Sequence, residues 1–366
     1  MQIDFHHTVT WVLARLSGFS DKEAAIIAYS SQYVDDACNC GVIRFHGDIR
    51  YSRTSSSHHT FDQRNFRCLS NLQVWIPFHF LPGNGGCRAG ENPDGTFIEK
   101  LRCTPDSYVA KDMVDSCIED RNRPYELHRL GITLHVYADT FAHQGFSGVA
   151  HESNGVMDFS GKIIPEPLWA CLFEKLKSSL IGRVLPLGHG AVLYYPDFPF
   201  AHWQYKNQWL IRNKKTEQGN RNNPELFMKA VDALYGVLCS FRRERGAADV
   251  PGKIPDADQE QIKKNFLAFT DYDAKVRHRQ WRESIQKGEF SFGGKGTECP
   301  QYIPKGVGSW KHLALGTEKE IDDKNDIFEF NESFLYCNWK LFHDALQKHR
   351  FVILRDILPR YGICGA

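Results

Sequence analysis

The chain has 366 residues, of which 42% are hydrophobic, and its formal net charge is +1 at pH 7. This length and composition allow a large core, so the fold does not need disulfide staples. The near-neutral charge provides no overall field that would point to nucleic acid or to an anionic membrane as a partner. The 11 cysteines form no C-x-x-C pair, which argues against a cysteine-type zinc finger and favours free thiols. Disulfides stay open for a few of them: Cys68, Cys87, Cys103 and Cys117.

The N-terminal segment, MQIDFHHTVTWVLARLSGF, does not have the pattern of a signal peptide. It lacks a basic start, and Arg15 interrupts its apolar run. No stretch of the chain approaches the roughly 20 apolar residues of a membrane span. We therefore expect a soluble protein that is cytoplasmic, or exported without a signal peptide.

Helical periodicity begins at about residue 4 and continues to residue 17. The capping box Ser20-x-x-Glu23 then opens a second helix, which we expect Gly41 to stop. Residues 42–104 are rich in turn signals and predict loops and short strands around one apolar segment, LQVWIPFHFLPG.

Beyond residue 104 most of the chain has helical patterns separated by irregular segments. The helical patterns cover 105–122, 124–144, 166–180, 223–245, 257–269, 271–286 and 331–358. The irregular segments are 145–164, 182–203 and 288–328. We predict a mainly α fold, a multi-helix bundle with long irregular insertions. We expect a single domain, 1–366, with a metal-site half at approximately 1–210 and a C-terminal helical half at approximately 220–366.

The segment LHVYADTFAH, residues 134–143, is apolar apart from polar residues at steps of four, among them His135, Asp139 and His143. On an α-helix these three lie within about 80° of one another, and His128 lies on the same face. Each step of four climbs about 6 Å, so Asp139 could share one metal with His135 and a second with His143. Burying such groups without partners is costly, which favours metal ligation; hydrogen-bonded core side chains are the alternative.

The first two helices offer further ligands. Asp35 and Asp36 lie at the end of the second helix, where the macrodipole disfavours each negative charge by about 0.3–1 kcal/mol. We therefore expect at least one of them to bind a cation, with Asp36 as the candidate ligand. Either Asp35 or Asp36, if it does not bind the metal, is expected to act as general base. His6 and His7 lie on neighbouring faces of the first helix, and either could be a ligand. We predict that the first helix, the end of the second and the 124–144 helix converge on one pocket.

Two loop histidines could close this pocket. His79 lies in the apolar segment WIPFHFLPG, and His189 lies between glycines in LGHGA, where a ligand can approach closely. Asp197 follows in YYPDFPF and is a further candidate. We predict His79 and His189 as metal ligands, with hydrogen-bonded core histidines as the alternative.

The segment RLGITLHVYADTFAHQGFSG, together with FHHTVTWVLARL, AYSSQYVDDA and WIPFHFLPG, resembles an uncharacterised bacterial protein family over roughly residues 3–210. More remotely, an N-terminal His, an Asp near the end of the next helix and H-x-x-x-D on a buried helix are similar to zinc-dependent phospholipase C and the related fungal single-strand nucleases. Those all-α enzymes hold a cluster of zinc ions with His and Asp and hydrolyse phosphoric ester bonds. The resemblance implies ligand positions at Asp35 or Asp36, His135, Asp139 and His143.

We therefore predict a metal-dependent hydrolase of phosphoric ester bonds in a phospholipid, a nucleotide or single-stranded nucleic acid. Two or three zinc ions are expected, with manganese or iron as alternatives. Arg44, Arg50, Arg53 and Arg64 could neutralise substrate phosphate. The alternative is a non-catalytic helical interaction protein with a structural metal or a polar core. The chain has no Walker A loop, and GFSGV is not the G-x-S-x-G elbow of serine hydrolases.

Overall fold

The computed structural model describes residues 1–366 except 59–67, 162–186, 215–218, 324 and 365–366. Its α-helices are α1 (Thr10–Leu16), α2 (Asp21–Asp36), α3 (Cys68–Phe78), α4 (Ile98–Leu101), α5 (Tyr108–Glu119), α6 (Glu126–Ala142), α8 (Gln208–Arg212), α9 (Asn223–Glu244), α10 (Asp256–Ala268), α11 (Ala274–Gln286), α12 (Trp310–Leu315) and α13 (Asn338–Phe351). Two π-helical segments are η1 (Asp4–Val9) and η11 (Val352–Ile357). Short 3-10 turns are η2 (His46–Asp48), η4 (Asn84–Gly86), η5 (Glu152–Asn154), η7 (Gly190–Val192), η8 (Tyr195–Asp197), η10 (Glu332–Tyr336) and η12 (Leu358–Tyr361).

Two small sheets accompany the helices. In the first, β1 (Gly41–Phe45) pairs antiparallel with β2 (Arg50–Arg53) and parallel with β6 (Ile327–Phe328). In the second, β4 (His202–Lys206) pairs antiparallel with both β3 (Asp158–Gly161) and β5 (Asn220–Asn222). The prediction of a mainly α fold is therefore wrong: helices dominate, but the molecule is a mixed α/β structure.

The short strands predicted within residues 42–104 are present as β1 and β2, whereas β3, β4, β5 and β6 lie outside that region and were not predicted, because they are short. A strand of two or three residues, such as β6 or β5, has too few positions to show alternating hydrophobicity. Only β4 alternates visibly, with Trp203 and Tyr205 buried between exposed neighbours, and most of it lies just beyond a segment that we expected to be irregular. Helix α3 was also missed, since its apolar residues give no amphipathic pattern.

Most of the long helices lie where periodicity predicted them. The capping box forms as expected: the Ser20 side chain accepts from the Glu23 amide, and the Glu23 carboxylate accepts from the Ser20 amide. The helix expected at 166–180 lies outside the described residues. Of the cysteines left open for disulfides, Cys87, Cys103 and Cys117 are free. No helix of the described residues is both long and apolar enough to cross a membrane.

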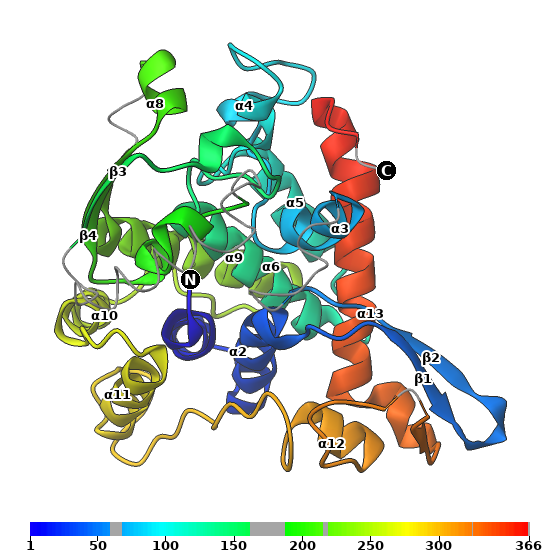
Figure 1. Cartoon of the computed structure of the whole chain (residues 1–366). Helices are drawn as coiled ribbons and strands as arrows, with labels where there is room; N and C mark the ends of the chain where they lie inside the picture. The colour runs from blue at the N-terminus through cyan, green and yellow to red at the C-terminus, as the bar shows by residue number, and fades with distance from the viewer. Residues whose placement is uncertain (59–67, 162–186, 215–218, 324, 365–366) are drawn as a thin grey trace.

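Helix α6 lies in the middle of the molecule, and the β1–β2 hairpin projects from the periphery (Figure 1). Helix α6 packs against α2, α5, α9 and α13, and every one of its residues from His128 to Ala142 is buried. Gly131 permits the closest of these contacts, because a Cβ at this position would lie 2.4 Å from the Ile27 carbonyl oxygen and 2.6 Å from the Ser30 Cβ. The consequence of this close contact is that the C-terminal half of α2 reaches the polar stripe of α6.

Candidate metal centre

Three donor atoms from α6 and the end of α3 form a triangle of nearly equal sides. His79 Nδ1 lies 3.3 Å from His135 Nε2. Asp139 Oδ2 lies 3.3 Å from His135 Nε2 and 3.4 Å from His79 Nδ1. A tetrahedral zinc ion with ligands at about 2.0–2.1 Å separates them by about 3.3–3.4 Å. The triangle therefore has the dimensions of one face of a zinc coordination tetrahedron.

The protonation of the two histidines is fixed by backbone carbonyls. His135 Nδ1 lies 2.8 Å from the Ser31 carbonyl oxygen, and His79 Nε2 lies 2.9 Å from that of Ser56. A carbonyl oxygen only accepts, so each of these ring nitrogens carries the proton. In the neutral imidazoles, His135 Nε2 and His79 Nδ1 then present lone pairs to each other and to Asp139. Burial lowers the pKa of His135 to about 4, which keeps this ring neutral at pH 7.

A second group of donors lies at the C-terminal end of α6. His143 Nε2 is 3.3 Å from Asp197 Oδ1, and His189 Nε2 is 3.7 Å from Asp197 Oδ2. Here too the other ring nitrogens donate to carbonyls, His143 Nδ1 to His79 at 2.8 Å and His189 Nδ1 to Leu193 at 2.7 Å. The Nε2 atoms of both rings therefore face the Asp197 carboxylate. These three side chains form a second set that could hold a metal ion.

Asp139 faces both a histidine pair and the N-terminal segment. Its Oδ2 belongs to the triangle, while its Oδ1 lies 3.2 Å from His6 Nε2 and 2.7 Å from the α-amino group of Met1. The amino group is also 3.1 Å from Asp197 Oδ1, so it links the two donor groups. Burial opposes ionisation of Asp139, but the surrounding imidazoles and the ammonium group hold its pKa well below the usual range. For the ammonium group, burial is outweighed by Asp139 and Asp197, which raise its pKa to about 11.

His6 stacks on His135 with ring centroids 3.8 Å apart. It is fully buried, and neither ring nitrogen has a hydrogen-bond partner among the described residues. Burial lowers the pKa of His6 well below its ordinary value. The Nε2 atom lies 3.2 Å from Asp139 Oδ1 in poor hydrogen-bond geometry, and Nδ1 has no such neighbour, so His6 is a buried polar group that a metal ion could satisfy.

Asp35 forms the accessible edge of the cluster. Its Oδ1 lies 3.8 Å from both His79 Nδ1 and His135 Nε2. The side chain keeps 32% of its surface exposed, whereas the Asp139 side chain keeps 2%. The protein that surrounds Asp35 and the nearby Asp139 carboxylate raise its pKa well above the usual range. A water molecule or a substrate could therefore reach the cluster beside Asp35.

Two predicted residues, Asp36 and His7, lie outside the cluster, and so does His128. Asp36 accepts hydrogen bonds from Tyr302 Oη at 2.6 Å and from Gln32 Nε2 at 3.2 Å. His7 lies on a neighbouring face of η1, turned toward α11, where its Nδ1 is 3.0 Å from His278 Nε2. His128, which shares the helical face with His135, instead bonds to Asn338 Oδ1 at 3.0 Å.

The structure therefore brings together seven side chains that the sequence proposed for this site: His6, Asp35, His79, His135, Asp139, His143 and His189. Asp197, a weaker sequence candidate, joins them. The convergence of the first helical segment, the end of α2 and α6 is as predicted. The pairing differs in one respect, since His143 faces Asp197 and His189 rather than sharing Asp139 with a second metal.

Residues 1–357 match the sequence model of a protein family of unknown function (DUF6765). The chain belongs to this family. No curated protein and no solved structure matches the chain. The family assignment agrees with the resemblance to an uncharacterised family, while the more remote similarity to phospholipases C and nucleases gains no support from these comparisons.

Sequence reasoning missed the Met1 amino group and the four carbonyls that orient the histidines. Neither leaves a signal in the sequence, because every residue has a carbonyl and only the tertiary fold selects which ones face an imidazole. The arginines proposed for phosphate binding are placed elsewhere or not described. Arg50 pairs with Asp48, Arg53 pairs with Asp322, and Arg64 lies outside the described residues.

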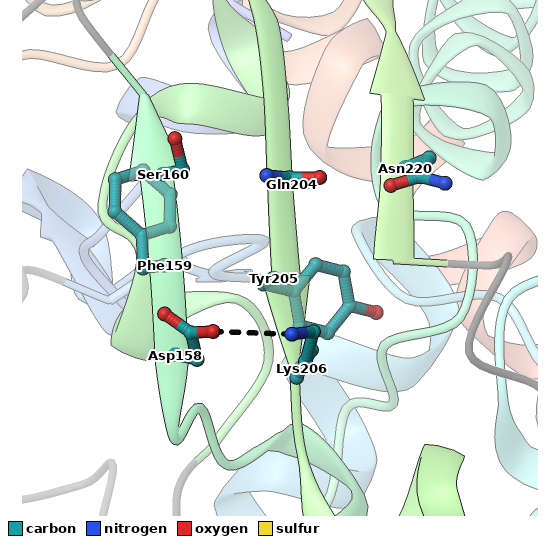
Figure 2. A pocket seen from close by; sticks show the side chains of 7 residues that line it. All are labelled: Asp158, Phe159, Ser160, Gln204, Tyr205, Lys206 and Asn220. Carbon is teal, nitrogen blue, oxygen red and sulfur yellow. Dashed lines mark ion pairs between the residues drawn. The ribbon is translucent and has the colours of Figure 1, made fainter.

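A hollow of about 270 Å³ lies over the β3–β4–β5 sheet and is separate from the cluster (Figure 2). Asp158 and Lys206 form an ion pair of 3.4 Å across it, and both side chains are largely exposed. An exposed pair of this kind contributes little to stability. The hollow contains none of the histidines described above and offers no comparable chemistry.

Proposed function

We propose that this protein is a metal-dependent hydrolase of phosphoric ester bonds, with zinc as the expected metal. The observation that carries the proposal is the triangle of His79, His135 and Asp139, whose sides match a zinc coordination face and whose two histidines each turn the other ring nitrogen to a backbone carbonyl. The second set, His143, His189 and Asp197, supports a centre of more than one ion. Phosphoric esters suit such a centre because two ions can clamp the attacking and leaving oxygens of an in-line displacement.

In this proposal the buried residues of the cluster bind metal, and the partly exposed Asp35 acts on water. The buried side chains His79, His135 and Asp139 hold the first ion, and His6 adds a nitrogen on the Oδ1 side of Asp139. Zinc supplies Lewis acidity and lowers the pKa of a bound water toward about 7. Asp35, the most exposed acid of the cluster, accepts the proton of the attacking water as general base. Its carboxylate lies farther from the histidines than Asp139 does, which leaves room for that water.

A non-catalytic protein with a structural metal is the second candidate. The near-complete burial of His6, His135 and Asp139 favours it, because structural zinc sites are closed and catalytic sites keep an open position. The exposed edge at Asp35 favours the enzyme. The two functions therefore differ in whether Asp35 borders an open coordination position.

The test is metal analysis of the purified protein, followed by hydrolysis of bis-p-nitrophenyl phosphate, a phospholipid and single-stranded DNA. We expect bound metal and hydrolysis of at least one substrate that a chelator abolishes and added zinc restores. Asp35→Asn should keep the metal and lose activity, whereas Asp36→Asn, the matched control on the same helix end, should keep both. Bound metal without hydrolysis of any substrate would favour the structural alternative, and a protein that binds no metal would exclude both.

A further inference from the structure

Helix α11 lies in the C-terminal half of the chain, yet its residue Arg277 contacts the segment that carries His6. Arg277 Nε donates to Asp4 Oδ2 at 2.6 Å, and its Nη2 donates to Asp4 Oδ1 at 3.3 Å and to Gln2 Oε1 at 2.5 Å. Both charged side chains are buried, with 0% of Arg277 and 1% of Asp4 exposed. A bidentate arginine–carboxylate pair fixes orientation as well as distance, so it sets the direction of η1.

The same guanidinium group also contacts the segment that carries Asp197. Its Cζ lies 5.4 Å from the ring centroid of Phe198 and 5.7 Å from that of Phe200. These are distances at which a cation and an aromatic face attract each other. Phe198 directly follows Asp197 in the chain, so one buried side chain holds two segments that are remote in sequence and that each deliver a donor to the cluster.

The neighbouring residue of α11 completes the attachment. His278 Nε2 lies 3.0 Å from His7 Nδ1, and His7 follows His6 in η1. One of these two nitrogens donates and the other accepts, so the two rings form a hydrogen-bonded pair, with Cys299 Sγ 3.9 Å from His7 Nδ1. The pair fixes the side of η1 that faces away from the cluster, which leaves His6 on the side that faces Asp139.

We propose that Arg277 is a positioning residue of the metal centre, which sets His6 and Asp197 in place from the C-terminal half of the chain. The inference rests on the proposed function. Arg277 contacts the segments that carry two donors of the cluster, whereas the triangle of His79, His135 and Asp139 is held mainly by α6, α3 and their carbonyl partners. Its loss therefore weakens part of the centre selectively.

The test is metal titration of full-length protein carrying Asp4→Asn with Arg277→Gln. This double substitution removes both buried charges together, because removing one alone would leave an unpaired buried charge and endanger folding. We expect the first equivalent of zinc to bind as in the wild type and the later equivalents to bind about 10–100-fold more weakly, the usual cost of losing the residues that orient ligands. In cobalt-substituted protein the visible absorption of the later equivalents should change as well. Arg279→Gln, an exposed arginine two residues along the same helix, is the control and should change nothing.

Arg277→Lys provides a second variant with the buried charge retained. Lysine can pair with Asp4 but cannot also reach Gln2 and both phenylalanine rings, so we again expect weaker binding of the later equivalents alone. Binding that is unchanged in both variants, with only a lower melting temperature of the metal-free protein, would overturn the inference and assign Arg277 a purely structural role. Equal weakening of all equivalents would overturn it too. A wild-type protein that binds no metal would instead refute the proposed function.

Discussion

Two buried polar regions lie on opposite sides of η1, and they differ in whether they are complete. On the α11 side, the donors of Arg277 meet the acceptors of Asp4, and the charges cancel. On the α6 side, imidazole lone pairs and the carboxyl groups of Asp35, Asp139 and Asp197 face one ammonium group. Both regions are buried, so burial alone does not indicate a binding site. The α6 side differs in having an excess of acceptors over donors, and this excess is what supports the proposed metal centre.

The strongest test of this difference is His135→Ala, with His128→Ala as the matched control on the same helical face. Loss of a residue that only orients a metal ligand typically lowers metal affinity by about 10–100-fold. His135→Ala removes a ligand itself, so it should lower metal affinity by more than this and abolish activity. His128→Ala should lower stability while metal content, measured by atomic emission, stays normal. Equal metal contents in the two variants would mean that the acceptor excess binds nothing.

A second test compares two carboxylates of different surroundings. Asp139→Asn should reduce metal content and hydrolysis about 100-fold or more, because an amide donates protons toward lone pairs that need a cation. Asp36→Asn should cost less than about tenfold, since an amide oxygen can still accept the Tyr302 hydrogen bond. Kinetics and metal analysis of both variants would measure the contrast. If the Asp139 change were as mild as the other, Asp139 would be an ordinary core hydrogen-bonding group.

The third test is the pH dependence of the stability of metal-free protein. Burial lowers the pKa of His128, His135 and His189 to about 4 and that of His343 to about 3. Between pH 6.5 and 4 the unfolded chain therefore binds more protons than the folded chain. Stability should be complete above about pH 6.5 and fall as the pH drops, by up to about 1.4 kcal/mol per pH unit for each such histidine.

Urea unfolding at a series of pH values would measure this slope. Zinc should reduce the acid sensitivity of the wild type but not of His135→Ala, because bound metal competes with protons for the same nitrogens. A flat profile for metal-free protein would show that the imidazoles are already satisfied.

The smallest expected effects lie in residues 288–328, compared with 124–145. Exposed positions of the first segment should change the free energy of unfolding by less than about 0.5 kcal/mol, whereas truncations in α6 should cost about 2–5 kcal/mol. The exceptions should be the buried residues of this segment, among them Phe290, Cys299, Tyr302 and Trp310. A deep mutational scan would show whether α6 is the more sensitive region.

The sequence by itself determined the long helices and the polar stripe of α6, because helical periodicity and capping are local properties of the chain. It also determined which residue types could bind a metal. Short strands were predicted only for the region of β1 and β2. The other strands and the mixed α/β class were not predictable, since strand pairing joins segments as remote as β1 and β6.

Only the tertiary structure decided between His6 and His7 and between Asp35 and Asp36. Adjacent residues of a regular helix differ by about 100° in direction, so the choice depends on which neighbour packs on which side. Contact with α11 turns His7 away from the cluster, and the close approach of α2 to α6 at Gly131 brings Asp35 toward it. The carbonyls that fix the histidine protons were decided in the same way, because they come from segments that meet only when the chain is folded.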